Sequence, residues 1–480
     1  MKRTPDFAGA QSGLRVLPFP AANDIQQPYP ANPPPTAPCR RRAVLDKIPT
    51  GGALTRPAHT AQCSWRTWGG ENGQPDPDDP RGKPAAPPKL IELNHQRVVG
   101  EKVDEATYAQ ELKNAVVELV SRQKEVGIDL VNDGEFGHTM GWDYDYGAWW
   151  SYVVRRLTGV EVEAKPLWMQ TLTAQIKTPM APGDFVVGEW MDRRDWKKFE
   201  EAYMDPRSGC ALPEQFMTHF SPVVKGPISY KGQEALQRDI ANLKAGLAAA
   251  GIKEGGWMNS VAPASCSRMA NEHYKTEEEL MYACADAMRE EYKAIIDAGL
   301  IVQLDDPAIG ENWDQQKEEP SVEGYRRYSR KCIDALNHAI RGLPADRIRF
   351  HLCWGSWHGP HTTDIPMKHL LDLMLAVNAN AYSFEAANAR HEHEWKLWKD
   401  VKLPAGKVIM PGVVTHSTNL IEHPEIVADR ICRYAEAVGR DKVVASTDCG
   451  LGGRVHPQIA WAKLEALAQG AALASKRLWS

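Results

Sequence analysis

The chain has 480 residues, of which 43% are hydrophobic and 25% charged, as is typical of a globular protein with a sizeable core. Its formal net charge of −5 lacks the basic excess of a nucleic-acid binder, and no apolar run is long enough to span a membrane. Nine cysteines are too sparse for a disulfide framework, and no basic segment precedes an apolar stretch as in a secretory signal, so we expect a reduced, cytoplasmic protein.

The first 90 residues differ in composition from the rest. They hold 17 of the 34 prolines, in runs such as PYPANPPPTAP that exclude helix interiors and sheet ladders. We therefore predict a Pro/Gly-rich, largely disordered extension over residues 1–88. No comparable linker interrupts residues 89–480, which we predict to form a single domain.

Helices are predicted in this domain from the periodicity of its apolar residues. Their ranges are 104–126, 277–298, 321–342, 366–378 and 422–438. The helix at 277–298 has the clearest start, because Thr276 is a suitable N-cap for a first turn that carries Glu277 and Glu279. These helices alternate with predicted strands.

Each predicted strand is short, rich in β-branched residues, and ends on a polar residue. The segments are EVGIDLVNDGE, DAGLIVQLDDP, ADRIRFHLCWG, NANAYSFEAAN, AGKVIMPGVVTHS and GRDKVVASTDCG. From His351 to Glu385 is 34 residues, and from Glu385 to His416 is 31. One βα unit has roughly 30 or more residues, so a polar residue recurs once per unit. This spacing favours an α/β fold of the (β/α)8 barrel class, in which all strand ends meet at one face, over a doubly wound open sheet.

A candidate metal site lies at these strand ends. In FHLCWG, His351 and Cys353 occupy positions i and i+2 of a strand, so their side chains point to the same side. Glu385 and Cys449 arrive from the ends of two later strands. One imidazole, two thiolates and one carboxylate are donors that suit Zn²⁺. An isolated His-x-Cys is more often a pair of core residues, and the once-per-unit spacing is what favours a metal here.

Short motifs at these positions follow a recognisable order. They are VNDGE (131–135), GPISY (226–230), VQLDDPA (302–308), HLCWG (351–355), FEAAN (384–388), MPGVVTHS (410–417) and TDCGLGGR (447–454). From about Leu90 to Val455 the chain resembles the cobalamin-independent methionine synthase family, and within it the shorter single-barrel relatives that include the epoxyalkane–coenzyme M transferases. The resemblance implies a TIM barrel of the uroporphyrinogen decarboxylase and methionine synthase type.

The resemblance also implies site residues. They are the zinc ligands His351, Cys353, Glu385 and Cys449, the acids Glu135 and Asp305 that contact the amino group of a thiol substrate, and the proton donor His416. The implied chemistry is coherent, because Zn²⁺ favours the nucleophilic thiolate form of a thiol. Glu385, as the only oxygen donor, is the ligand expected to give way to substrate. A histidine ordinarily titrates near neutral pH and can protonate a poor leaving group.

These residues indicate a zinc-dependent methyl- or alkyltransferase that acts on a small-molecule thiol and an alkyl donor. The nearest activity is methyl transfer from a methyl-folate to homocysteine, which gives methionine. Thiol addition to an epoxide is an alternative, since both reactions need a thiolate and a proton donor. A metal-free lyase like the uroporphyrinogen decarboxylases and a non-catalytic zinc protein are more distant alternatives. Ligands on distant strands argue against a structural zinc, whose ligands are usually closely spaced.

Two features depart from the family pattern. The THxGSxPRP-like first strand of the family has its closest counterpart in PTGGALTRP at 49–57, which lacks the His and the Ser. The chain also has room for one barrel only, whereas full-length synthases carry a second barrel that helps to bind the folate. Homocysteine and methyl-folate therefore do not follow from the resemblance alone.

Other polar residues near the motifs have less specific patterns. Asp306 and Asp448 flank the predicted ligands, and each either orients a ligand or begins a helix. His391 and His393, in RHEHEWKLW, resemble a further metal pair. Because positions i and i+2 of a helix do not face each other, we predict that both are surface residues.

Overall fold

The fold is described from a computed structural model. The described residues are 87–98, 101–138, 148–166, 185, 188, 192–205, 207–210, 218–316, 319–355, 357–452 and 454–480. All of them belong to one compact unit, Arg56–Ser480. Apart from its last two residues, the predicted extension over residues 1–88 lies outside the described residues, as does the PTGGALTRP segment.

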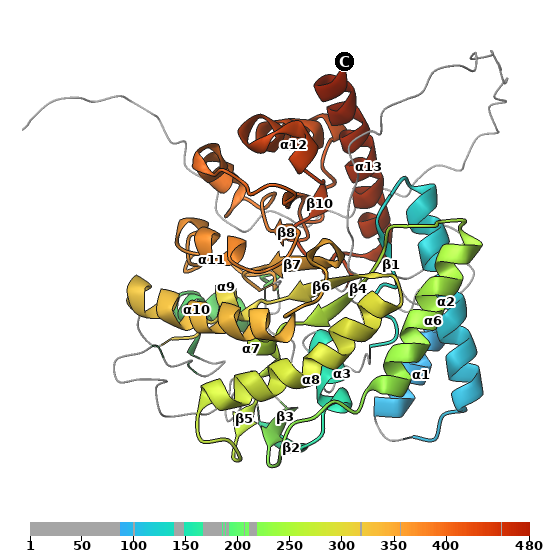
Figure 1. The fold of residues 1–480 in the computed structure, drawn as a ribbon, viewed down its shortest axis with the longest axis vertical. Helices are drawn as coiled ribbons and strands as arrows, with labels where there is room; N and C mark the ends of the chain where they lie inside the picture. The colour runs from blue at the N-terminus through green and yellow to red at the C-terminus, as the bar shows by residue number, and fades with distance from the viewer. Residues whose placement is uncertain are drawn as a thin grey trace, which may run out of the picture. The chain divides into compact units, whose positions relative to one another are not determined.

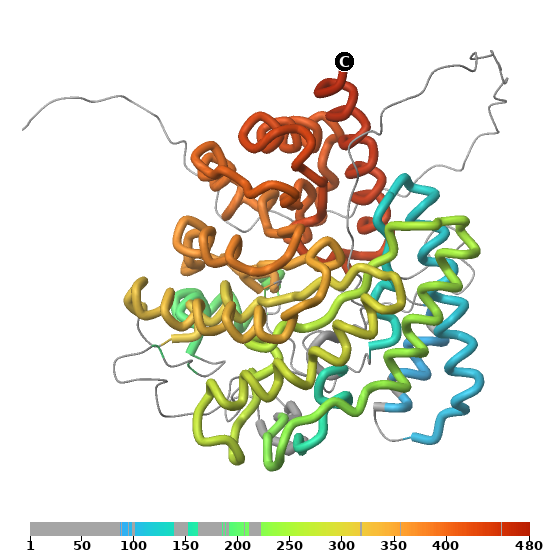
Figure 2. The backbone as a smooth tube through the Cα atoms, in the orientation of Figure 1, coloured from blue at the N-terminus to red at the C-terminus, as the bar shows by residue number. Residues whose placement is uncertain are grey.

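The centre of the described structure is a seven-stranded sheet (Figure 1). Its strands are β1 Val131–Asn132, β4 Gly256–Val261, β6 Ile301–Asp305, β7 Ile348–Leu352, β8 Ala381–Phe384, β9 Val408–Val414 and β10 Ser446–Thr447. They lie side by side in chain order and every neighbouring pair is parallel. Figure 2 shows the later part of the chain passing from yellow through orange to red toward the top of the view. All carboxyl ends therefore lie at one edge of the sheet. The strand β4 was not predicted, whereas the others follow the predicted segments.

Helices connect the strands and pack around them (Figure 1). The longer ones are α1 Pro88–Val98, α2 Glu105–Glu125, α6 Gln233–Ala249, α8 Glu277–Asp297, α10 Val322–Ala339, α12 Pro424–Val438 and α13 Pro457–Trp479. The shorter ones are α3 Ala148–Arg156, α4 Arg194–Lys198, α5 Glu200–Met204, α7 Pro263–Cys266, α9 Ala308–Glu311, α11 Leu371–Leu375 and the 3₁₀ turns η4 Ala345–Arg347, η5 Met367–His369, η6 Glu392–Asp400 and η7 Arg440–Lys442. Among the residues described, no helix combines the length and apolar character that a membrane crossing requires.

Four of the five predicted helices agree with these bounds. Thr276 is the N-cap of α8, and its side chain accepts a hydrogen bond from Glu279 N, as expected. The helix predicted at 366–378 is instead the 3₁₀ turn η5 followed by the short helix α11. The two are separated at Leu370, whose φ of −115° departs from helical geometry.

A smaller sheet, which the sequence patterns did not predict, is formed by two strands that lie between β1 and β4 in the chain and one strand that follows β4. In it β2 Val160–Pro166 pairs antiparallel with β3 Thr218–Val224, and β3 pairs with the short β5 Ala270–Asn271. Figure 1 shows this sheet at the lower edge of the view, below α8. The sequence signal was weak because two of the three strands carry Pro, which is rare inside a ladder.

A buried ionic network connects the segment between β1 and β4 to the central sheet. Arg156, at the end of α3, donates to Asp239 of α6 at 2.6 Å and to Glu291 of α8 at 3.0 Å. Ser260 of β4 donates to the same Glu291 carboxylate at 2.7 Å. All four side chains are buried. Because buried charges are stable only when paired, this network fixes α3 against α6, α8 and β4.

Removal of the cation from this network should destabilise the fold. Arg156→Met keeps most of the side-chain volume but leaves Asp239 and Glu291 without their shared cation. We expect the free energy of unfolding in urea to fall by about 3–5 kcal/mol. The matched control is Arg155→Met, at an exposed position of the same helix, for which a change within about 0.5 kcal/mol is expected. Equal effects of the two substitutions would contradict this account.

Candidate functional site

The site is built on one row of residues across three parallel strands. Asp305 of β6 is in register with His351 of β7, and His351 is in register with Ser383 of β8. Ser383 Oγ lies 3.0 Å from His351 Nδ1, within hydrogen-bond distance. This contact fixes the imidazole ring and leaves Nε2 as the nitrogen available to another partner.

Three of the predicted ligands converge beside this row. Ligand atoms of His351, Cys353 and Cys449 all lie within 4.8 Å of one another, and all three side chains are buried. Donors bound to one tetrahedral Zn²⁺ lie about 3.5–4 Å apart, so small side-chain adjustments would bring these atoms around one ion. Contact with Cys449 and burial raise the pKa of the Cys353 thiol well above its ordinary value. A cation between the sulfurs would favour their thiolates instead, so the donor set fits zinc.

Glu385 lies next to this group but is held separately. One of its carboxylate oxygens, Oε1, accepts a hydrogen bond from Trp354 N at 2.9 Å, and the other, Oε2, accepts one from Asn388 Nδ2 at 2.8 Å. Its ligand atom clusters within 4.8 Å of those of His416 and Asp448. Burial and the nearby Asp448 raise the pKa of Glu385 above its usual range. The fourth predicted ligand is thus adjacent to the other three, in a hydrogen-bonded position of its own.

Asp448 orients the loop that carries Glu385. Its Oδ1 atom accepts hydrogen bonds from Ala386 N at 2.6 Å and Ala387 N at 2.7 Å. The Cβ of an alanine at Gly412 would lie 2.1 Å from the same oxygen, so the close approach of β9 requires glycine there. Of the two roles considered for Asp448, orientation is the one that these contacts support, since the next helix begins only at Pro457.

The turn after β6 supports the end of β7. Asp306 N donates to His351 O at 3.0 Å, and Ser265 Oγ donates to Asp306 Oδ1 at 2.7 Å. The Cβ of an alanine at Gly310 would lie 2.4 Å from Cys353 O, so α9 packs directly on the main chain of this predicted ligand. The backbone that presents His351 and Cys353 is therefore fixed from the β6 side.

His416 follows β9 and is almost fully buried. Its loop is held by Glu422, which accepts hydrogen bonds from Thr415 N at 2.8 Å and from Lys463 Nζ at 2.9 Å. Burial lowers the pKa of His416 to about 3. The imidazole is therefore neutral at neutral pH in this state, where the sequence suggested a group that titrates near pH 7. A neutral imidazole still carries one N–H that it can donate.

The two predicted substrate-binding acids lie at the same edge of the sheet. Asp305 Oδ2 accepts from Asn259 Nδ2 at 2.7 Å, and Oδ1 accepts from Gln303 Nε2 at 2.8 Å. Glu135 follows β1, is 1% exposed, and has φ of 60°. A left-handed backbone is uncommon for a residue other than glycine and tends to mark functional turns. Both carboxylates are thus buried at strand ends rather than solvated.

The prediction for His391 is wrong, whereas His393 is exposed as predicted. His391 is buried because its ring nitrogens contact Glu394 at 2.9 Å and Asp364 at 3.1 Å, and its ring stacks on Trp354 at 4.0 Å. The segment that follows is the 3₁₀ turn η6, for which His391 is the N-cap. The contact with Glu394, three residues later, could have been predicted from the sequence. The contact with Asp364, 27 residues earlier, could not.

Sequence reasoning missed the neutral residues that support the site. They are Asn259, Gln303, Ser383 and Asn388. Gln303 could have been found, because it precedes Asp305 by two positions on the same strand and therefore shares its face. Asn259 could not, because its strand was not predicted.

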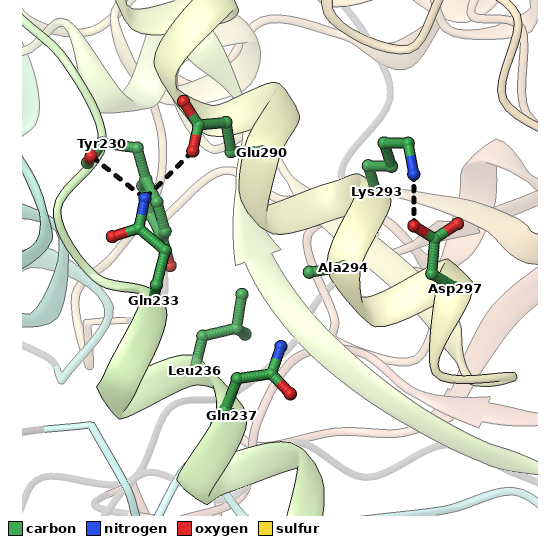
Figure 3. Close-up of a pocket in the computed structure, with 8 residues that line it drawn as sticks. All are labelled: Tyr230, Gln233, Leu236, Gln237, Glu290, Lys293, Ala294 and Asp297. Carbon is green, nitrogen blue, oxygen red and sulfur yellow. Dashed lines mark hydrogen bonds and ion pairs between the residues drawn. The ribbon is translucent and has the colours of Figure 1, made fainter.

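A pocket of about 290 Å³ lies elsewhere, between α6 and α8 (Figure 3). Gln233 Nε2 donates to Glu290 Oε2 at 3.0 Å within it, and Lys293 pairs with Asp297 on the α8 side. None of the predicted site residues lines this pocket. We assign it no part in the chemistry.

Comparison with protein families gives one match. The model described as "Cobalamin-independent synthase, Catalytic domain" matches residues 221–472, slightly more than half of the chain. This range contains the strands from β4 to β10 and every predicted site residue except Glu135.

Individual relatives are more distant. The methionine synthases of Saccharolobus solfataricus and Thermococcus kodakarensis are 26% and 25% identical over 211 and 209 residues. Each alignment covers 43% of this chain and 54% of the relative, so the chain matches about half the length of these proteins. A solved B12-independent methionine synthase from Shewanella sp. W3-18-1, in complex with selenomethionine, has 22% identity and a TM-score of 0.57 over 79% of this chain and 92% of its own. Together with the parallel sheet, this likeness confirms the predicted (β/α)8 barrel class.

The metal site can be tested by removing one sulfur at a time. Cys353→Ser and Cys449→Ser should each lower the apparent zinc affinity by at least about 100-fold, since loss of a mere supporting partner typically costs 10- to 100-fold. Zinc content and competition with a chromophoric chelator measure this effect. Cys432→Ser, at a half-buried position of α12, is the matched control and should retain wild-type affinity. Near-stoichiometric zinc in both site variants would exclude the assignment.

Proposed function

The chain belongs to the cobalamin-independent methionine synthase family, and on that premise we propose that it is a zinc-dependent methyltransferase that methylates the sulfur of homocysteine to give methionine. The observation that carries the proposal is the convergence of His351, Cys353 and Cys449 at the strand ends. The named synthases match this chain over only about half their length. The activity is therefore inferred from the residues of the site.

We infer that His351 Nε2 and the sulfurs of Cys353 and Cys449 hold the metal, with Glu385 as the fourth and weakest ligand. Zn²⁺ bound at these residues would favour the nucleophilic thiolate form of a substrate thiol. Ser383 fixes the imidazole of His351 and thereby directs its free nitrogen toward the sulfurs. A catalytic zinc site needs an exchangeable position, and the carboxylate of Glu385 is the ligand that already has other partners.

The acidic pair favours a thiol that carries an ammonium group. Asp305 and Glu135 are buried carboxylates at the edge where the metal ligands lie. An amino-acid thiol such as homocysteine would place its ammonium group against them. A thiol with a sulfonate in its place, such as coenzyme M, would face like charge. The pair therefore supports homocysteine over the epoxide-opening alternative, although both reactions would use the same metal ligands.

We propose that His416 assists the departure of the methyl donor. When the methyl group moves to sulfur, the electron pair of the broken bond stays on the donor, which then takes up a proton. His416 Nδ1 is buried and has no hydrogen-bond partner within the described structure. A ring nitrogen in that position is available to bond the leaving atom or a water beside it. Ligand atoms of Glu385 and Asp448 lie within 4.8 Å of a ring nitrogen of His416.

We also propose which residues form the catalytic unit and in which compartment it works. We place the unit at residues 89–480, because the elements from α1 to α13 supply both the sheet and the candidate site. Cys353 and Cys449 must stay reduced to bind metal, which suits a reducing compartment such as the cytoplasm.

The proposed substrate can be tested with the zinc-loaded protein and a methyl-folate. Homocysteine should be methylated, and Asp305→Asn should raise its KM about tenfold or more, because loss of one charge-assisted hydrogen bond costs about 1.5–3 kcal/mol. Binding of 3-mercaptopropionate, which has no amino group, should change far less. Asp286→Asn, at an exposed position of α8, is the control. If neither homocysteine nor any thiol of a panel binds the zinc-loaded protein, the proposed function fails.

A further inference from the structure

Both oxygens of the Glu385 carboxylate have a hydrogen-bond donor in the fold. Trp354 N donates to Oε1 at 2.9 Å, and Asn388 Nδ2 donates to Oε2 at 2.8 Å. The side chain is 4% exposed, so water does not compete strongly for these bonds. The proposed function uses Glu385 as a metal ligand and gives no role to Asn388. A buried amide that points at a metal ligand requires an explanation.

The orientation of Asn388 is fixed by its other atom. Asn388 Oδ1 accepts hydrogen bonds from Arg390 N at 3.0 Å and His391 N at 2.9 Å. Because these main-chain groups are donors, the amide cannot turn over without losing both bonds. Its NH₂ group is therefore held facing Glu385.

The second donor is equally rigid. Trp354 directly follows the ligand Cys353, and its ring is buried, donates to Ile365 O at 2.7 Å and stacks on His391. Asp448 meanwhile fixes the main chain of Ala386 and Ala387, from which the Glu385 side chain extends. The carboxylate and its two donors thus form a preorganised cradle beside the metal group.

We propose that Asn388 is a positioning residue that, with the Trp354 N–H, gives Glu385 a resting place off the metal and so makes it the ligand that yields to the substrate thiol. The inference rests on the proposed function. The cradle competes with a metal for the same carboxylate because of where it holds Glu385. In the cradle, the Glu385 carboxylate lies outside the group formed by the ligand atoms of His351, Cys353 and Cys449. It must therefore move to bind a metal at those atoms, and that movement lengthens the bonds to Trp354 N and Asn388 Nδ2. A hydrogen bond to a charged group typically changes an equilibrium by about tenfold or more. The cradle therefore favours the thiol-bound state and disfavours the resting, Glu385-bound state.

The test removes the amide that donates to Glu385 and keeps the hydrogen bonds to Arg390 N and His391 N. In Asn388→Ser, the hydroxyl can still accept from the main-chain N–H groups two and three residues later but is too short to reach Glu385. We expect zinc affinity, measured by chelator competition, to rise about three- to tenfold, because Glu385 loses its alternative position. Homocysteine affinity of the zinc-loaded protein, measured by calorimetry, should fall by a similar factor. His393→Ala, on the exposed side of η6, is the control and should change neither.

A double-mutant cycle assigns the effect to Glu385. In a Glu385→Ala background, Asn388→Ser should alter neither affinity. Unchanged affinities in the single variant, or equal changes in both backgrounds, would overturn the proposal. Should Asn388→Ser fail to fold, Asn388→Asp retains the acceptor and removes the donor, and the same cycle subtracts its added charge. If the wild type binds no thiol, the proposed function fails but the role of Asn388 is still tested. The zinc affinities of the four proteins in the cycle report on the cradle without any thiol.

Discussion

The parallel register of β6, β7 and β8 is the constraint on which the site depends. It sets Asp305, His351 and Ser383 in one row, so that the proposed substrate-binding carboxylate, a proposed metal ligand and the hydroxyl that contacts this ligand lie on adjacent strands. A shift of one residue in any strand would turn its side chain to the opposite face. The tight packing of Gly310 on Cys353 O and the bond from Asp306 N to His351 O hold this register at the strand ends.

Burial of so many polar groups at one edge is stable because neutral partners accompany the charged ones. Asn259 and Gln303 donate to Asp305, and main-chain N–H groups donate to Asp448. Each bond offsets part of the free energy that the carboxylate loses on leaving water. The same bonds restrict where the carboxylate can point. Solvation of the charge and preorganisation of the site therefore have the same structural origin.

The strand ends could be predicted from sequence because a β-branched run followed by a polar residue is a local pattern. His351, Cys353, Glu385 and Cys449 were found in this way, and the structure places all four at one edge. The strand β4 was missed because Gly, Asn and Ser interrupt its apolar run GWMNSV. His391 was misplaced because Asp364, one of the partners that hold it inside, is 27 residues away and no periodicity reveals it. Local patterns identify the candidate site residues, whereas the residues that hydrogen-bond to them come in part from distant segments.

The candidate ligands divide by chemistry into two neighbouring groups. His351, Cys353 and Cys449 supply nitrogen and sulfur, and their positions are set by strands and by Ser383. Glu385, His416 and Asp448 supply oxygen and nitrogen, and hydrogen bonds from loops hold the two carboxylates. The two groups therefore differ in how the fold holds them, since strand register positions His351 and hydrogen bonds from loops position the carboxylates. Under the proposed function, the first group would retain the metal and Glu385 of the second would be the ligand that exchanges with the thiol.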